Sequence, residues 1–266
     1  MAIITLTTDF GYADYYVGAM KGVICQIAPQ AIIVDITHDI PAHDLVAAAL
    51  VAREMWRSFP PKTIHVVVVD PGVGTPRKII LAQFAGQMFL VPDNGILTLI
   101  QQTYAAEQVN VVANESLFCQ PVFPTFHGRD IFAPVAAHLA KGIRPDQVGP
   151  RTNFLTLLDI PVPRVSEGQK ILGQVIHVDR FGNLLTNVGA DDLGKLARAG
   201  GTLEVSLGGR WIGPVRRTFA DVAKGQPVAY LGSAGLLEIA INLGRADKDL
   251  SAGSGTLVEV TPAQNP

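Results

Sequence analysis

Short β-branched runs alternate with helical patterns in the first half of the chain. The runs that predict strands are Ile3–Thr8, Ala31–Thr37, Thr63–Val69, Lys78–Phe84 and Met88–Val91. Apolar residues at helical spacing predict a helix over Tyr16–Ile27, and an alanine-rich segment after Pro41 predicts another over Asp44–Phe59. Buried strands that alternate with helices are typical of a mostly parallel sheet covered by helices. We therefore expect an N-terminal three-layer α/β domain.

The pattern changes in the segment Leu158–Lys170, where prolines and a glycine interrupt both periodicities. Beyond it lie short strand-like runs joined by glycine turns, namely Leu172–Val178, Thr202–Ser206, Pro227–Leu231 and Thr256–Val260. This arrangement is typical of a small antiparallel barrel or sandwich. We place the α/β domain at residues 1–163 and a smaller, all-β, barrel-like C-terminal domain at residues 169–266.

Composition narrows the classes of partner. The chain has 266 residues, 48% of them hydrophobic, and 21 basic residues against 23 acidic ones. This balance gives no electrostatic footprint for nucleic acid or an anionic membrane surface. No secretory signal and no apolar run of about 20 residues is present, so we expect a cytoplasmic protein without a membrane partner. Cys25 and Cys119 form no Cys-x-x-Cys motif and are expected to be buried, reduced thiols.

Several predicted strands end in an acidic residue. Asp9, Asp35, Asp70 and Asp93 all occupy such positions. A single aspartate there is ordinarily a turn former or a helix cap. Ligands of open α/β sheets bind beyond the carboxyl ends of the strands, so four such acids together favour a shared crevice.

The loop Val69–Arg77 admits three interpretations. A dinucleotide fingerprint fails because Arg77 occupies the third glycine position and Pro76 would interrupt the helix start. A methyltransferase glycine loop is weakened because a strand follows at once, with no intervening helix. The third interpretation is a rigid loop that brings Asp70 and Arg77 to one point, where they could pair and orient a small polar species. A purely structural turn is the alternative.

His127 lies just before a predicted alanine-rich helix, Ile131–Lys141. Asp130 could cap this helix, which would leave the imidazole free to face the crevice and, with an orienting acid such as Asp70, to hold a water. A metal site is the rival interpretation for His38, Asp39, His43, Asp44 and His127. None of these shows a spacing that fixes metal geometry, so we expect no metal.

Taken together, the motifs resemble the family of S-adenosyl-L-methionine (SAM) hydroxide adenosyltransferases, to which SAM-dependent fluorinases and chlorinases are related. The resemblance spans nearly the whole chain, in order. The matching runs are Thr8-Asp9-Phe10-Gly11, Tyr16-Val17-Gly18, Asp35-Ile36-Thr37-His38, Val69-Asp70-Pro71-Gly72-Val73-Gly74, Pro92-Asp93-Asn94-Gly95, Phe126-His127-Gly128-Arg129-Asp130, Asp179-Arg180-Phe181-Gly182-Asn183 and Ser233 through Asn242.

The resemblance implies an activity and an assembly. SAM would be hydrolysed to adenosine and L-methionine by water or hydroxide attacking the ribose 5′ carbon, with SAM as substrate and no cofactor. The family also implies a homotrimer whose active sites lie between one subunit's N-terminal domain and its neighbour's C-terminal domain.

The resemblance also assigns roles to residues. Asp9 and the nearby Asp14 would hold the ribose. Adenine and the methionine tail would be held by Asp179, Asn183 and Ser233, with Phe219 stacking on the base. Asp70, Arg77 and His127 match the trio of the hydroxide-using enzymes, which halogenases lack. The sequence leaves open whether Asp70 or His127 accepts the proton.

Three alternatives remain at this stage. A SAM-dependent halogenase is disfavoured by the trio and by the short connection before Pro92, which has no room for the fluorinase loop. A SAM- or adenosine-binding protein without turnover and a metal-dependent hydrolase are the others. Two departures from the family, Gly232 in place of asparagine and Ala234 in place of the fluorinase arginine, affect the predicted contacts to the methionine tail.

Overall fold

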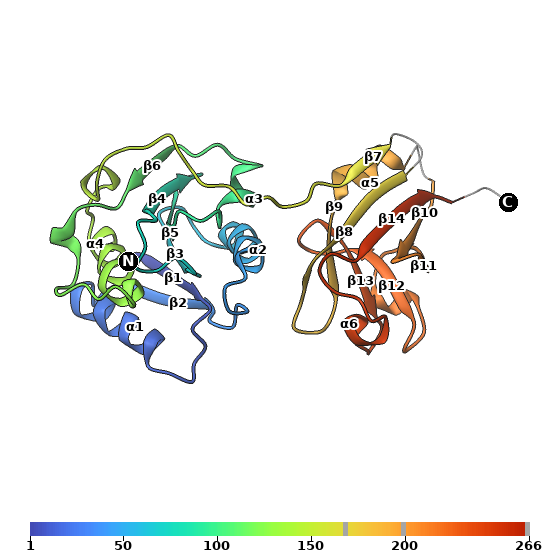
Figure 1. Cartoon of the computed structure of the whole chain (residues 1–266), viewed down its shortest axis with the longest axis horizontal. Coiled ribbons are helices and arrows are strands. Elements are labelled where there is room, and N and C mark those ends of the chain that lie inside the picture. The colour runs from blue at the N-terminus through green and yellow to red at the C-terminus, as the bar shows by residue number, and fades with distance from the viewer. Residues whose placement is uncertain (167–169, 198–200, 264–266) are drawn as a thin grey trace. The chain divides into compact units, whose positions relative to one another are not determined.

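A computed structural model describes residues 1–166, 170–197 and 201–263 (Figure 1). Internal contacts divide the chain into two compact units, residues 1–158 and 159–266. The start that we predicted for the second domain, residue 169, lies outside the described residues. Each unit is described below by itself.

The first unit contains a six-stranded sheet, as far as its residues are described, with the order β2-β1-β3-β5-β4-β6. The strands are β1 (Ile3–Thr8), β2 (Ile32–Thr37), β3 (Ile64–Val68), β4 (Ile79–Phe84), β5 (Gln87–Pro92) and β6 (Gln108–Val111). Parallel pairing joins β2, β1, β3 and β5, whereas β4 runs antiparallel to both β5 and β6. The carboxyl ends of the four parallel strands therefore meet at one edge.

Helices pack against this sheet through two hydrophobic clusters. The helices are α1 (Tyr16–Ile27), α2 (Leu45–Met55), α3 (Thr98–Gln101) and α4 (Ala133–Ala140). Val66 and Val68 of β3 belong to the cluster that includes α1 and α4, and Val67 belongs to the cluster that includes α2. Successive strand residues point to opposite faces, so β3 is buried on both. The arrangement of this domain in three layers stays a prediction.

A polar network crosses the core at His65 of β3, whose side chain is fully buried. Its Nδ1 lies 2.8 Å from the Thr5 hydroxyl, and its Nε2 lies 2.6 Å from Gln87 Oε1. The Gln87 amide nitrogen donates to the carbonyls of Trp56 and Phe59. The Gln87 oxygen therefore accepts from Nε2–H, and Thr5 donates to Nδ1. Burial lowers the pKa of His65 to about 4.

The second unit is built around a closed β-barrel. Its strands are β7 (Arg164–Ser166), β8 (Lys170–Val178), β9 (Leu184–Gly189), β10 (Leu203–Leu207), β11 (Arg210–Arg216), β12 (Pro227–Leu231), β13 (Leu236–Ile241) and β14 (Leu257–Pro262). β14 pairs with both β10 and β8, which closes a ring of seven strands. β11 and β12 are parallel, and the short helices α5 (Ala190–Leu196) and α6 (Ala246–Asp249) lie between strands. Because the ring of strands is closed, the second unit is a barrel and not a sandwich.

The two cysteines differ in their exposure. Cys25 is exposed, which corrects the expectation of a buried thiol, because it lies on the face of α1 that Val17, Met20 and Ile24 do not share. Cys119 is partly buried.

Within the described parts of the chain, no helix is long and apolar enough to cross a lipid bilayer.

Candidate active site

A pocket of about 320 Å³ lies beyond the ends of β1 and β3. It brings together three residues predicted from the sequence, Asp9, Asp70 and His127. The remaining walls are mainly apolar or aromatic and comprise Phe10, Tyr16, Ala42, His43, Val68, Val73, Thr125, Phe126 and Gly128. Parallel strands deliver Asp9 and Asp70 to the same sheet edge, which is the usual ligand position of such sheets.

Asp70 and His127 are joined through Arg77. Nε of Arg77 donates to Asp70 Oδ1 at 2.9 Å, and Nη2 donates to Oδ2 of the same carboxylate. Nη2 also lies 3.0 Å from His127 Nδ1. The side chains of Asp70 and Arg77 are 5% and 11% exposed, so water screens this pair only weakly. The pairing predicted for the loop is thus present, and His127 is attached to it through the guanidinium.

The direction of the contact between Arg77 and His127 defines the state of the imidazole. A guanidinium can only donate, so Nδ1 of His127 accepts and its proton is on Nε2. Burial, together with the charge of Arg77, lowers the pKa of His127. The ring is therefore a neutral Nε2–H donor in this arrangement.

Asp9 is held by the loop after β2. The backbone N–H of His43 donates to Asp9 Oδ2 at 3.0 Å, and His43 has a φ of 66°, the left-handed conformation that points this N–H at the carboxylate. Asp14 is exposed on the loop before α1 and does not line the pocket. Within this unit, the structure thus brings Asp9 to the crevice but leaves Asp14 outside it.

Two of the four strand-end acids do not reach the pocket, which corrects the expectation of a shared crevice. Asp35 accepts from Lys21 at 2.5 Å and from the Tyr12 hydroxyl at 3.0 Å. Asp93 accepts from the backbone N–H of Thr156 at 2.8 Å. Both are occupied by local donors, as isolated turn aspartates commonly are.

Asp130 does not cap a helix, which corrects a second expectation. Its carboxylate accepts from the backbone N–H of Phe123 and from Arg129, and its side chain is 2% exposed. The segment Gly128–Phe132 forms a π-helical turn ahead of α4. Through these bonds, Asp130 anchors the loop that carries His127.

In the barrel, Asp179 and Asn183 form one hydrogen-bonded turn between β8 and β9. Asp179 Oδ1 accepts from the backbone N–H groups of Phe181 and Asn183, and Oδ2 accepts from the Asn183 side chain at 2.9 Å. Phe219 packs on Tyr230 with ring centroids 4.7 Å apart. Ser233 is exposed in the turn between β12 and β13.

Glu238, which our sequence analysis did not assign a role, explains one departure from the family. Its carboxylate accepts from the Tyr230 hydroxyl at 2.6 Å, and burial raises its pKa. A side chain at position 232 would overlap the Glu238 carboxylate. Gly232 therefore leaves room for the Glu238 carboxylate in its bond to Tyr230, and an asparagine at this position would force that carboxylate to move.

Three of the pocket residues missed by sequence reasoning are aromatic. Phe10, Tyr16 and Phe126 line the pocket, yet apolar residues next to a motif give no signal that separates them from the core. A hint was available, since Phe10 and Phe126 stand directly beside Asp9 and His127. Over the residues that the structure describes, no group of three or more His, Cys, Asp or Glu side chains is placed to hold a metal ion.

Comparisons with known proteins identify the family. The family model for the SAM hydroxide adenosyltransferase N-terminal domain matches residues 4–149, and the family model for the C-terminal domain matches residues 173–259. An (R)-S-adenosyl-L-methionine hydrolase of Thermus thermophilus is 40% identical over 98% of this chain and 100% of its own length. A fluorinase of Nocardia brasiliensis is 28% identical over 97% of this chain and 96% of its own.

A solved structure shows the same fold. The crystal structure of a conserved protein from Thermotoga maritima has a TM-score of 0.89 and 39% identity, and the match covers 98% of this chain and 100% of that one. The matched domains span most of the sequence and both structural units. This chain therefore belongs to the SAM hydroxide adenosyltransferase family.

Proposed function

We propose that this chain hydrolyses S-adenosyl-L-methionine to adenosine and L-methionine. The observation that carries the proposal is the chain of contacts from Asp70 through Arg77 to His127, at one wall of a pocket that also contains Asp9. Relatives at 36–40% identity over nearly the full chain are named (R)-S-adenosyl-L-methionine hydrolase. We extend that substrate, including the R configuration at sulfur, to this protein.

The reaction is a displacement at the ribose 5′ carbon. A bond forms between water oxygen and this carbon while the carbon–sulfur bond breaks, and its electron pair stays on sulfur as a neutral thioether. The leaving group needs no proton, so catalysis consists of placing water in line and removing one proton from it. Positioning and base assistance of this kind each contribute several powers of ten in rate.

Asp70 is the group that accepts the proton lost by the attacking water. Nδ1 of His127 is occupied by Arg77 and its Nε2 carries hydrogen, so the imidazole has no free acceptor for a proton from water. Its Nε2–H can instead donate to the water oxygen and orient the lone pair that attacks. Asp70 keeps acceptor capacity beyond its two bonds to Arg77, and Arg77 lowers the cost of the charge that develops on oxygen.

The rest of the substrate is assigned by family resemblance and by position. Asp9 binds the ribose hydroxyls from within the pocket, and the family resemblance assigns Asp14, on the exposed loop before α1, to the same ribose. Asp179, Asn183, Phe219 and Ser233 hold adenine and the methionine tail from a neighbouring subunit of a homotrimer. The reaction uses no cofactor or metal, because water and a carboxylate suffice for it.

The test follows products formed in oxygen-18 water. Adenosine that carries one heavy oxygen, with equimolar methionine, is expected from each epimer that is turned over. Asp70→Asn and His127→Ala are each expected to lower kcat by about 10²- to 10⁴-fold while leaving SAM binding within a few-fold. The matched control is Asp93→Asn, which changes a strand-end aspartate outside the pocket and should retain kcat.

Two outcomes would contradict the proposal. Tight SAM binding without adenosine would favour a binding protein, and a 5′-halo nucleoside formed only with added halide would favour a halogenase. A full kcat in His127→Ala would remove the imidazole from the mechanism.

A further inference from the structure

His38 is buried beside the strand end that delivers Asp9 to the pocket. Its side chain is fully buried, and it closes the motif Asp35-Ile36-Thr37-His38, to which the proposed function gives no role. Nδ1 of His38 lies 2.8 Å from the Thr8 hydroxyl, and Nε2 lies 3.1 Å from Asp35 Oδ1. The imidazole therefore links the segment at the end of β2 to the last residue of β1.

An irregularity of the sheet brings Asp35 and His38 to the same side. In a regular strand, side chains three positions apart point to opposite faces. The pairing of β2 with β1 shifts in register, however, and leaves Ile36 as an extra residue between Asp35 and Thr37. An extra residue of this kind reorients the side chains beside it, and such bulges are frequent next to active sites. The contact between Asp35 and His38 depends on this bulge.

The direction of the hydrogen bonds along this chain of contacts can be assigned. Nε2 of His38 and Oδ1 of Asp35 are buried, and within the described residues neither forms a hydrogen bond with a third group, so their electrostatic contact compensates for their burial. A lone pair on Nε2 would be repelled by the carboxylate. Nε2 therefore carries hydrogen, and Nδ1 of the neutral ring accepts from the Thr8 hydroxyl. The Thr8 oxygen in turn accepts from the backbone N–H of Phe10 at 3.2 Å.

Asp35 is itself anchored at the outer end of this chain of contacts. It accepts from Lys21 of α1 at 2.5 Å and from the Tyr12 hydroxyl at 3.0 Å. The Tyr12 ring also packs against the imidazole of His38, nearly perpendicular to it, with ring centroids 4.9 Å apart. These contacts hold the imidazole in one orientation.

The inner end restrains the backbone on both sides of Asp9. Thr8 precedes Asp9 and Phe10 follows it, and both take part in the hydrogen bonds. The backbone carbonyl of His38 also accepts from the N–H of Gly11 at 2.8 Å. The segment that presents Asp9 is thus held by the side chain and by the backbone of His38.

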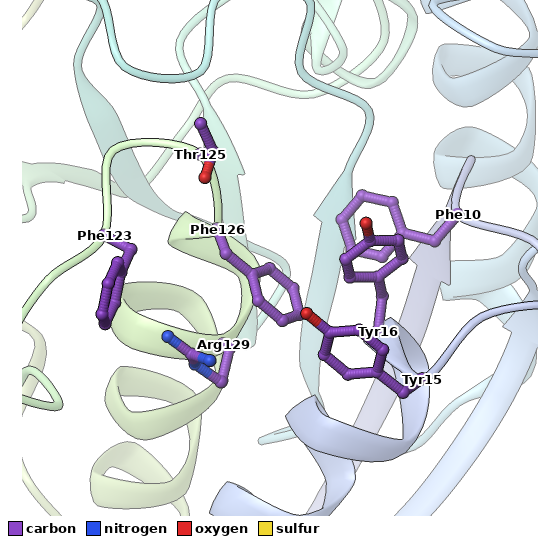
Figure 2. Close-up of a pocket in the computed structure, with 7 residues that line it drawn as sticks. All are labelled: Phe10, Tyr15, Tyr16, Phe123, Thr125, Phe126 and Arg129. Carbon is purple, nitrogen blue, oxygen red and sulfur yellow. The ribbon is translucent and has the colours of Figure 1, made fainter.

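The same segment supplies an aromatic wall of the pocket. Phe10 lines the pocket that contains Asp9 and also an adjoining pocket of about 380 Å³. Figure 2 shows its ring beside Tyr16 and Phe126, and the ring centroids lie 5.9 and 6.3 Å from that of Phe10. A shift of residues 8–11 would therefore displace a carboxylate and an aromatic ring of the pocket together.

We propose that His38 is a positioning residue for substrate binding, which acts through Thr8 to fix the turn that presents Asp9 to the ribose hydroxyls. This inference rests on the function proposed above. His38 does not line the pocket, so it acts without touching the substrate. Asp9 makes the same bonds to the ribose before and during displacement at the 5′ carbon. A displaced Asp9 therefore raises KM and leaves kcat nearly unchanged.

The experiment replaces the hydroxyl that joins His38 to the turn. Thr8→Val should raise the KM for SAM about 10-fold, the size of a weakened hydrogen bond to a charged group, with kcat within about 3-fold of wild type. Thr8→Ser keeps the hydroxyl and should retain the wild-type KM. Thr5→Val is the matched control, because Thr5 is equally buried in β1, its hydroxyl lies 2.8 Å from Nδ1 of His65, and it lines neither pocket. It should lower stability and leave KM unchanged.

Two nucleosides separate the positioning of Asp9 from general damage to the site. Adenosine carries both ribose hydroxyls, and 2′,3′-dideoxyadenosine carries neither. In calorimetry, Thr8→Val should weaken adenosine binding about 10-fold and dideoxyadenosine binding much less. Asp35→Asn changes the outer end, where the side chain is 27% exposed, and should show the same selectivity at smaller size. This second variant carries the test if Thr8→Val does not fold.

The outcomes are distinct. An unchanged KM in Thr8→Val, with wild-type turnover intact, overturns this inference and leaves the proposed function standing. Equal weakening of the two nucleosides, or an equal rise of KM in Thr5→Val, also overturns it, because the effect then does not pass through Asp9. Absence of SAM turnover by wild type contradicts the proposed function, and the nucleoside comparison then decides this inference by itself.

Discussion

Replacing His65 with glutamine should remove a large part of the pH dependence of folding. The pKa of His65 is about 4 in the folded protein, against an ordinary value of 6.5 for an exposed histidine. The unfolded chain therefore binds a proton that the folded chain does not, and stability contributed by this site is full above pH 6.5 and lost as pH falls toward 4. The loss between pH 7.5 and pH 5 amounts to about 2 kcal/mol.

The assay is urea unfolding of wild type and His65→Gln at several pH values across this range. The difference between the two unfolding free energies cancels other titrating groups, so it should change by about 2 kcal/mol. Thr5→Val is the matched control, because it removes the Thr5 hydroxyl that bonds to Nδ1 but keeps the imidazole. It should lower stability while retaining most of the pH dependence. Parallel curves for wild type and His65→Gln would refute the reasoning.

Two further predictions concern the site and the barrel. The lowered pKa of His127 predicts that kcat falls on the acid side with a midpoint below pH 6.5, because an imidazolium would face Arg77. In His127→Gln, which keeps an N–H donor, the midpoint of this fall should move to lower pH. An unchanged midpoint would contradict the assignment of the fall to His127. Gly232→Asn should destabilise the barrel in thermal unfolding, and Glu238→Ala in the same chain should recover most of that loss because it vacates the overlapping space.

Much of the fold could be predicted from sequence because its elements are locally consistent. The predicted β1, α1 and β12 match the structure residue for residue, since each carries an unbroken pattern between clear turn signals. The structure adds strands with weaker patterns, such as β6 and β11. Barrel closure also depends on register, because β14 must pair with two strands far away in sequence, and no local pattern encodes that.

The site was predictable where chemistry is carried by charged residues in a short loop. Asp70 and Arg77 are seven positions apart, so their pairing follows from one turn. The contact with His127 spans 50 positions, and its direction depends on which nitrogen faces the guanidinium. Asp35 and Asp93 had the same local signal as Asp9, and only their tertiary partners separate them.

The position of β14 has a consequence for how the chain folds during synthesis. This strand occupies the place between β10 and β8, and it leaves the ribosome after the other six strands of the ring. Until residues 257–262 emerge, β8 and β10 each present an unpaired edge inside the gap, so the barrel cannot close. The sheet of residues 1–158 lacks this dependence, and it can fold while the barrel is still being made.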